Sequence, residues 1–222
     1  MMKTKQDSRQ EQNQNQNEKQ DNTTPQIIPA EAVQWRWLAA VIPCYYGKNR
    51  NGCMVHYVDG KVQLVQARCE RVLEGWMQYY NTTLERVQSL AEELAGTEEG
   101  RKLPRVINRN CCILALKARE EQKRNSGTLG YFVMQHIAYV LETDDHGTYI
   151  FFNQQHKGIR ITQKKASVEQ QIQRGQQSLA RYVELQYDRQ QAEEQLLEKS
   201  RKKQQNRKRN PKSEKQEQKQ DK

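Results

Sequence analysis

Two short alternating runs on either side of an Asp-Gly pair give the clearest local signal in the chain. Residues 53–58 and 61–66 alternate apolar and polar side chains, as strands with one buried face do. Asp59-Gly60 lies between them and favours the positive φ angles of a two-residue type I′ turn. The pattern therefore predicts a β-hairpin. Its expected buried positions are Val55, Tyr57, Val62 and Leu64.

Further apolar runs predict more strands. Residues 34–42 read as a strand that ends at Pro43, because proline cannot donate to a sheet ladder. Residues 102–107 read as an extended segment around Pro104. The later runs that predict strands are 111–116, 131–141, 148–152 and 159–162, the last two forming a second hairpin.

Two helices are predicted from their starts. Residues 82–85 match the capping-box pattern, and we expect the helix that they open to end at Gly96 or Gly100. Residues 167–170 match it again and open a long helix that reaches about Lys202. The apolar positions at helical spacing are Leu84, Val87, Leu90, Ala91 and Leu94 in the first helix, and Val168, Ile172, Leu179, Val183, Leu196 and Leu197 in the second.

Because the strands are grouped rather than alternating with helices, the expected fold class is α+β. We expect a mainly antiparallel sheet of about seven strands in hairpins, one internal helix and a long C-terminal helix. The expected organisation is a disordered Gln/Asn-rich arm (1–30), a β-rich domain (31–175), an amphipathic helix continuing from residue 167 (176–200), and a disordered basic tail (201–222).

The positive charge of the chain is concentrated at its end. The net charge is +10, and residues 199–222 carry eleven Lys/Arg against three Asp/Glu, which is +8, so that residues 1–198 carry only +2. Such a segment attracts polyanions without reading their sequence, because bound cations release counterions from phosphates. The candidate residues for this non-specific contact with nucleic acid are Arg201, Lys202, Lys203, Arg207, Lys208 and Arg209.

The composition also bounds the cellular setting. The N-terminus has no apolar segment of the kind found in secretory signals, and no run approaches about 18 apolar residues, so we expect no membrane span. Five cysteines, an odd number, favour free thiols. We therefore expect a cytoplasmic protein.

Motifs of catalysis are missing. The chain contains no GxxxxGK[ST], GxGxxG, GxSxG or HExxH pattern, so we expect neither an enzyme nor a cofactor. Cys53 and His56 have a C-x2-H spacing, and a zinc site there is the alternative to free cysteines packed as small apolar residues. In a strand these two side chains point to opposite faces, so we expect no metal.

Cations at loop and strand ends of the body are the candidates for specific DNA contact. They are Lys117, Arg119, Lys123, Arg124, Arg160, Lys164 and Lys165. The alternative is an ordinary soluble surface. The aromatic residues do not interleave with these cations as on a stacking platform. Those that we expect in the core are Trp35, Trp37, Tyr131, Phe132, Phe151 and Phe152.

The order of segments over residues 38–175 resembles the ComK-type competence transcription factors. A strand ending in proline at residues 38–43 and a hairpin leading to a cysteine at residues 53–69 are similar to the N-terminal half of that family. The likeness resumes with a lysine and a proline at residues 102–107, continues through apolar strands and a closing hairpin, and ends in a Glu/Gln-rich helix from Ser167. The resemblance implies a transcriptional activator that binds A/T-rich double-stranded DNA as an oligomer, largely through the minor groove.

A second hypothesis makes the C-terminal helix the working part. In it the chain is a non-catalytic interaction module, and the helix from residue 167 to 201 binds a protein partner or pairs with itself as a coiled coil. Its apolar anchors are sparse for a heptad seam. The expected partners are thus double-stranded DNA, a second copy of the chain and a protein at the C-terminal helix, with no membrane.

Overall fold

The computed structural model describes residues 25–47, 50–96, 102–120, 127–144, 147–153 and 155–209, with the side chains of 206–209 left out. Its strands are β1 (Gln26–Ile28), β2 (Leu38–Tyr46), β3 (Arg50–Tyr57), β4 (Val62–Val65), β5 (Arg105–Asn108), β6 (Cys111–Lys117), β7 (Leu129–Val133), β8 (Ile137–Glu142), β9 (Thr148–Phe152) and β10 (Ile159–Ile161). Its helices are α2 (Cys69–Tyr79), α3 (Leu84–Ala95), α4 (Lys165–Arg209) and the 3₁₀ turns η1 (Ala30–Ala32), η2 (Trp35–Trp37) and η4 (Met134–His136).

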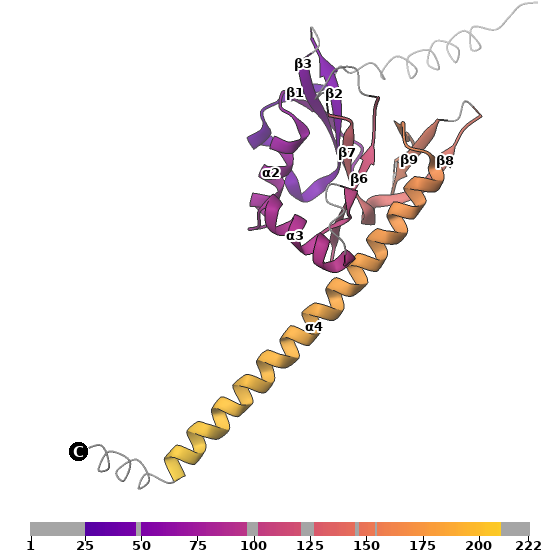
Figure 1. The fold of residues 1–222 in the computed structure, drawn as a ribbon. Coiled ribbons are helices and arrows are strands. Elements are labelled where there is room, and N and C mark those ends of the chain that lie inside the picture. The colour runs from indigo at the N-terminus through magenta and orange to yellow at the C-terminus, as the bar shows by residue number, and fades with distance from the viewer. Residues whose placement is uncertain are drawn as a thin grey trace, which may run out of the picture.

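The strands form two sheets, and the α+β class is confirmed. Seven strands lie in the order β1-β4-β3-β2-β7-β6-β5, and three more in the order β10-β9-β8. Every pairing is antiparallel except β1 with β4, which is parallel. Helix α2 lies on one side of the large sheet, whereas the small sheet and the start of α4 lie on the other (Figure 1). The body therefore has helices on one face and a sheet-plus-helix layer on the opposite face.

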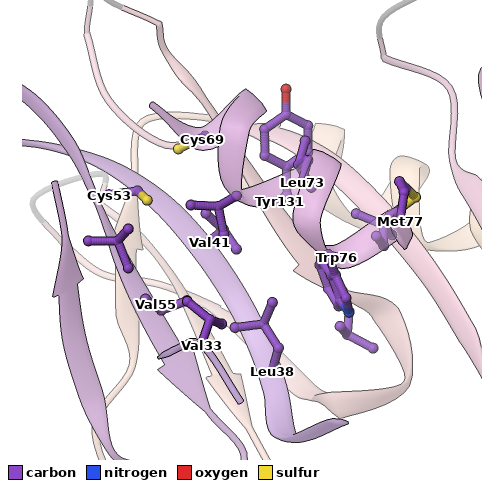
Figure 2. Close-up of a cluster of buried hydrophobic side chains, with 14 of the residues drawn as sticks. Val33, Leu38, Val41, Cys53, Val55, Cys69, Leu73, Trp76, Met77 and Tyr131 are labelled. Atoms are coloured by element: carbon purple, nitrogen blue, oxygen red, sulfur yellow. The ribbon is translucent and has the colours of Figure 1, made fainter. Parts of the chain in front are cut away.

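Each face of the large sheet has its own apolar core, because successive strand residues point to opposite sides. The first core joins α2 to β2, β3 and β7, with Trp76, Leu73 and Val41 almost fully buried in it (Figure 2). The second core joins the large sheet to β9, β10 and α4 through Phe132, Phe152 and neighbouring side chains. The rings of Phe132 and Phe152 stack with centroids 6.4 Å apart, which links the two sheets directly.

The predicted hairpin forms, but its turn has three residues rather than two. The Tyr57 N–H donates to the Lys61 carbonyl at 3.0 Å, and the Gly60 N–H donates to the Tyr57 carbonyl at 3.0 Å. Gly60 has a φ of 85°, whereas Asp59 does not have the positive φ of a type I′ turn. A type I turn followed by a left-handed glycine gives this bulged loop.

The longer turn reverses the predicted face of β4. Val65 and Gln63 are buried, whereas Val62 and Leu64, which we expected inside, are only partly covered. One additional residue in a loop moves every following side chain to the other face, because the strand period is two. Val55 and Tyr57 on β3 do lie in the first core, as expected.

The first predicted strand has different limits. Residues 35–37 form a 3₁₀ turn, and β2 starts at Leu38 and runs through Pro43 to Tyr46. Strand β7 pairs with β2 only at Ala40 and Val41, so one edge of β2 is open at Pro43. A proline, which has no N–H, is tolerated at such an edge.

Two elements were not predicted. Strand β1 lies inside the segment that we expected to be disordered; the rest of that arm, residues 1–24, lies outside the described residues. Helix α2 buries Val72, Leu73, Trp76 and Met77 but has no side-chain N-cap. It also contains Gly75, whose missing Cβ leaves room for the Trp35 ring. Without a cap and with a central glycine, α2 lacks the signals that identify a helix from sequence.

The predicted strand 131–141 is two strands in two different sheets. The 3₁₀ turn at Met134–His136 separates β7 from β8, so His136 lies in a turn and not inside a strand. Helix α3 begins after the N-cap Thr83, whose Oγ1 accepts from the Arg86 N–H, and it ends at Gly96 in the left-handed conformation. The helix and its end at Gly96 were predicted, and the N-cap lies one residue later.

Helix α4 packs on the body over its first half and then leaves it (Figure 1). It begins at Lys165, ahead of the predicted capping box at Ser167, and continues to Arg209, beyond Lys202 where we expected its end. Arg181 donates to the last carbonyls of α3 at Leu94, at 2.6 Å. From residue 186 to 205 every α4 residue is exposed. None of the described helices has the length and apolar character to cross a bilayer.

At Gly175 the backbone of α4 approaches the large sheet closely. A Cβ at this position would lie 2.6 Å from the Met134 Sδ and 2.9 Å from the Leu114 Cδ2. The Cys112 thiol is 3.9 Å from the Gly175 carbonyl oxygen, in hydrogen-bond geometry. Glycine lowers helix propensity, so its presence here is explained by packing rather than by helix formation.

We expect Gly175→Val to lower the free energy of unfolding by about 1–3 kcal/mol, because the new methyl groups overpack the second core. Helix propensity alone favours valine over glycine, so any loss measures the clash. Urea unfolding followed by circular dichroism gives the value. The control is Ala192→Val on the exposed stretch of α4, expected within about 0.7 kcal/mol of the parent. Equal effects of the two substitutions would contradict the packing explanation.

Candidate nucleic-acid interface

The end of β6 is joined to the segment between β10 and α4. Strand β5 pairs with β6 only as far as Ile113, which leaves the edge of β6 open at Lys117. The Lys117 carbonyl accepts from the N–H groups of Thr162 and Gln163, both at 3.1 Å, and from the Thr162 hydroxyl at 3.1 Å. The Gln163 Oε1 in turn accepts from the Lys117 N–H at 2.8 Å. These bonds fix the start of α4 against the large sheet.

Four of the predicted DNA-binding residues belong to this junction. We call Lys117, Arg160, Lys164 and Lys165 the junction cations. Lys117 ends β6, Arg160 is on β10, and Lys164 and Lys165 follow Gln163 at the start of α4. All are exposed or half-exposed. The hydrogen bonds at Lys117 therefore bring together cations that are more than forty positions apart in the sequence.

Lys117 and Lys165 each lie close to an acidic side chain. The Lys117 Nζ lies 2.8 Å from a carboxylate oxygen of Glu120, and the Lys165 Nζ lies 3.8 Å from one of Glu169. These are exposed pairs within three or four residues, and such pairs contribute about 0–1 kcal/mol each. A phosphate can therefore compete for either lysine at little cost.

Arg119 is engaged inside the body rather than at the junction. Its guanidinium carbon lies 3.9 Å from the centroid of the Tyr45 ring. Its Nε donates to the Gly127 carbonyl at 2.9 Å, and its NH2 group donates to Asn51 at 3.2 Å. These contacts connect the end of β6 to β2 and β3, so we leave Arg119 out of the candidate interface.

The other predicted residues lie on α4 or outside the description. Lys123 and Arg124 are outside the described residues. Arg201, Lys202 and Lys203 are exposed on the far part of α4, where Lys202 pairs with Glu198 at 2.6 Å. The backbone of Arg207, Lys208 and Arg209 is helical, and their side chains are outside the description, as are residues 210–222. The described start of the basic tail is thus a helix.

The cysteine thiols have no electrostatic support for reactivity. All five are free; burial raises the pKa of Cys44 to about 11 and that of Cys111 and Cys112 to about 12. A protonated thiol is a poor nucleophile and a poor metal ligand. Cys53 lies in the first core, and His56, on the alternate position of β3, points to the other face. Within the described residues no group of three His, Cys, Asp or Glu side chains is placed to hold a metal ion.

A second surface combines aromatic side chains with a cation. The residues on the side of the small sheet that faces away from the second core form what we call the outer face: Tyr139, Leu141, Tyr149, Phe151 and Arg160. In register across the three strands, Arg160 pairs with Tyr149 and Tyr149 with Leu141. Two expectations are therefore wrong: Phe151 is not a core residue, and aromatics do lie beside a candidate cation. Trp37, also expected in the core, is half-exposed.

Sequence reasoning missed the residues that build both surfaces. Thr162 and Gln163 make the junction, but nothing in their pattern shows that the edge of β6 stays open next to them. The outer face had a readable signal, because Tyr149 and Phe151 alternate with the buried Ile150 and Phe152. The run of apolar residues concealed this alternation, since both faces of β9 carry large side chains.

No family model, curated protein or solved structure matches this chain.

The histidine that we first weighed as a zinc ligand makes stability depend on pH. Burial lowers the pKa of His56 from 6.5 to about 4, and it also lowers the pKa of His136. Between pH 6.5 and about pH 4 the unfolded chain binds a proton at His56 that the folded protein does not bind. The free energy of unfolding therefore falls as the pH falls. We expect His56 to account for a loss of about 2 kcal/mol between pH 7 and pH 5.

Urea unfolding at both pH values tests this expectation, with His56→Gln as the comparison. The variant lacks the titrating group, so its stability should fall less than that of the parent over the same interval. The same fall in both proteins would show that His56 does not titrate in this range.

Proposed function

We propose that the chain is a DNA-binding transcriptional regulator, an activator of the competence type that recognises A/T-rich duplexes in the minor groove. The observation that carries the proposal is the junction, where hydrogen bonds at Lys117 gather four cations from β6, β10 and the start of α4. The order of segments that resembles the ComK-type factors supports the same function. Oligomeric binding and a cytoplasmic location, where the five thiols stay reduced, belong to the proposal.

A small set of cations is sufficient for this mode of binding. Readout in the minor groove distinguishes mainly A·T from G·C pairs and responds to groove width, which a few inserted Arg or Lys side chains can detect. The large positive charge of the chain lies elsewhere, in residues 199–222. We assign sequence preference to the junction cations and salt-sensitive, sequence-independent affinity to the basic end of α4.

The test replaces all four junction cations with Gln and measures binding to A/T-rich and G/C-rich duplexes over a range of salt concentrations. We expect the preference for A/T-rich DNA to disappear and affinity for the A/T-rich duplex to fall at least about tenfold, with a shallower salt dependence. The charge-matched control replaces four exposed cations away from the junction: Arg36, Lys61, Arg86 and Arg109.

Deleting residues 199–222 should weaken binding to both duplexes equally and leave the preference intact. The proposal fails if the parent protein binds both duplexes equally well, or if the control variant loses as much affinity as the junction variant.

The exposed stretch of α4 favours a second candidate function, an interaction module. Tyr187, Leu196 and Leu197 are 61%, 63% and 58% exposed on a helix that has left the body. Large apolar side chains on an unsupported helix are stabilised when another surface covers them. In this alternative the helix pairs with a second copy or a protein partner, and the basic end only supplements it.

Light scattering of the full chain distinguishes the two. If α4 self-associates, replacing Tyr187, Leu196 and Leu197 with Gln should give a monomer without changing the duplex preference, whereas the 199–222 deletion, which keeps these side chains, should remain associated. A parent protein that is monomeric at high concentration contradicts pairing between copies.

A further inference from the structure

The outer face of the small sheet is unusually apolar for an exposed surface. Tyr139 is 55% exposed and Leu141 is 44% exposed, two residues apart on β8. Strand β8 is at the edge of its sheet, and within the described residues no helix or strand covers the side on which these residues lie. The second core already fills the other side of the same strands with Ile150, Phe152 and Ile161. The exposure is therefore a property of this face and not of a poorly packed sheet.

Tyr139 is held in a defined orientation. Its ring stacks on the ring of Phe151 with centroids 4.5 Å apart and an angle of 12° between the planes. Gly158 lies against the Phe151 ring, since a Cβ there would be 2.7 Å from it. Phe151 is thus confined between Tyr139 and the backbone of residue 158. Tyr139 and Phe151 therefore form a parallel ring pair in which Phe151 supports Tyr139. Tyr139 is the member on the edge strand, and it is exposed to solvent.

Positive charge lies at one side of this ring pair. Arg160 is exposed on β10. It pairs with Tyr149 on β9, which in turn pairs with Leu141 on β8, so Arg160 lies two strands from Leu141. Lys164 is exposed three residues beyond the end of β10, just before α4. Glu142 is the acidic residue nearest in sequence to the ring pair on β8, and it alternates to the other side of the strand from Leu141. A ring that can stack on a base and the Arg160 guanidinium, which can bind a phosphate, therefore lie on one face of the small sheet.

We propose that the outer face binds single-stranded nucleic acid, with a base stacked on Tyr139 and the adjoining phosphates at Arg160 and Lys164. Aromatic rings on a sheet beside cations are the general means of holding single strands, because every base offers a π-face. In a duplex those faces are covered by neighbouring base pairs, so a flat ring pair has nothing to stack on. The chemistry of this surface therefore favours a single strand over a duplex and a nucleic acid over an apolar protein.

This site is distinct from the duplex contact proposed above, although Arg160 and Lys164 belong to both. The stacking part of the proposal depends on Tyr139 and Phe151 alone and so can be tested separately. Phe151 acts as a positioning residue, because it orients Tyr139 and is itself half-buried.

The experiment uses the full chain and two fluorescent probes of about twelve nucleotides, a length within the range that single-strand-binding domains cover. One is oligothymidine, and the other is an abasic strand with the same phosphates and no bases. Anisotropy is measured at about 0.3 M salt, where phosphate contacts are weakened. We expect at least about fivefold tighter binding of oligothymidine than of the abasic strand.

Three substitutions test whether Tyr139 causes the difference in affinity between the two probes. Tyr139→Ala should abolish it, and Tyr139→Phe, which keeps the ring, should retain it. Tyr79→Ala removes a tyrosine that is 47% exposed at the end of α2 and should leave it unchanged. Because Tyr139 is exposed, circular dichroism melting of Tyr139→Ala should match that of the parent.

Equal affinity for the two probes overturns the proposal, as does a loss of the difference in Tyr79→Ala. If Tyr139→Ala weakens duplex binding but not the preference for bases, the face contacts duplex DNA instead. If it changes only the association state of the protein, the face is a protein interface. The variant with Gln at all four junction cations separates the two proposals. It should have lower affinity for the duplex and for the abasic strand. Stacking on Tyr139 should persist in it as tighter binding of oligothymidine than of the abasic strand.

Discussion

The carbonyl of Lys117 is the point on which the arrangement of the molecule depends. Strand β6 is longer than its neighbour β5, and the unpaired backbone at its end is satisfied by Thr162 and Gln163. These four hydrogen bonds contribute about 0.5–1.5 kcal/mol each and join the segment before α4 to the end of β6. They place the small sheet over the second core and start α4 where Gly175 can meet Leu114. The cations of the junction are gathered as a consequence of backbone hydrogen bonding.

The fold class follows from the sequence because it depends on local chemistry. The start of α3, its end at a glycine and the alternation of β3 are each decided within a few residues; the helix and the buried face of β3 were predicted, with the cap one residue early and the end left between Gly96 and Gly100. The face of β4 was not predicted, although the hairpin itself was. The Asp59-Gly60 pair permits turns of two and of three residues, and the choice between them decides whether Val62 or Gln63 is buried.

The interface was harder to foresee because it depends on contacts between distant segments. In the sequence Lys117 and Lys164 are isolated cations, and only the contacts at the open edge of β6 bring their segments together. Arg119 looks the same in the sequence, but in the structure it contacts Tyr45 and Asn51. The stacking of Tyr139 on Phe151 required knowing that residues 131–141 divide between two sheets at Met134. In β9 both faces carry large side chains, so local periodicity did not show which side meets the core and which meets water.

The length of α4 separates the two charged regions, the junction cations and the basic end of the helix. The stretch from Lys165 to Lys199 measures about 50 Å at 1.5 Å per residue, several times the screening length of about 8 Å at physiological salt. Charges that far apart do not reinforce one another through the solvent. If both regions bind one long polyanion, contact at one region raises the local concentration of the other, at the distance that the length of α4 sets.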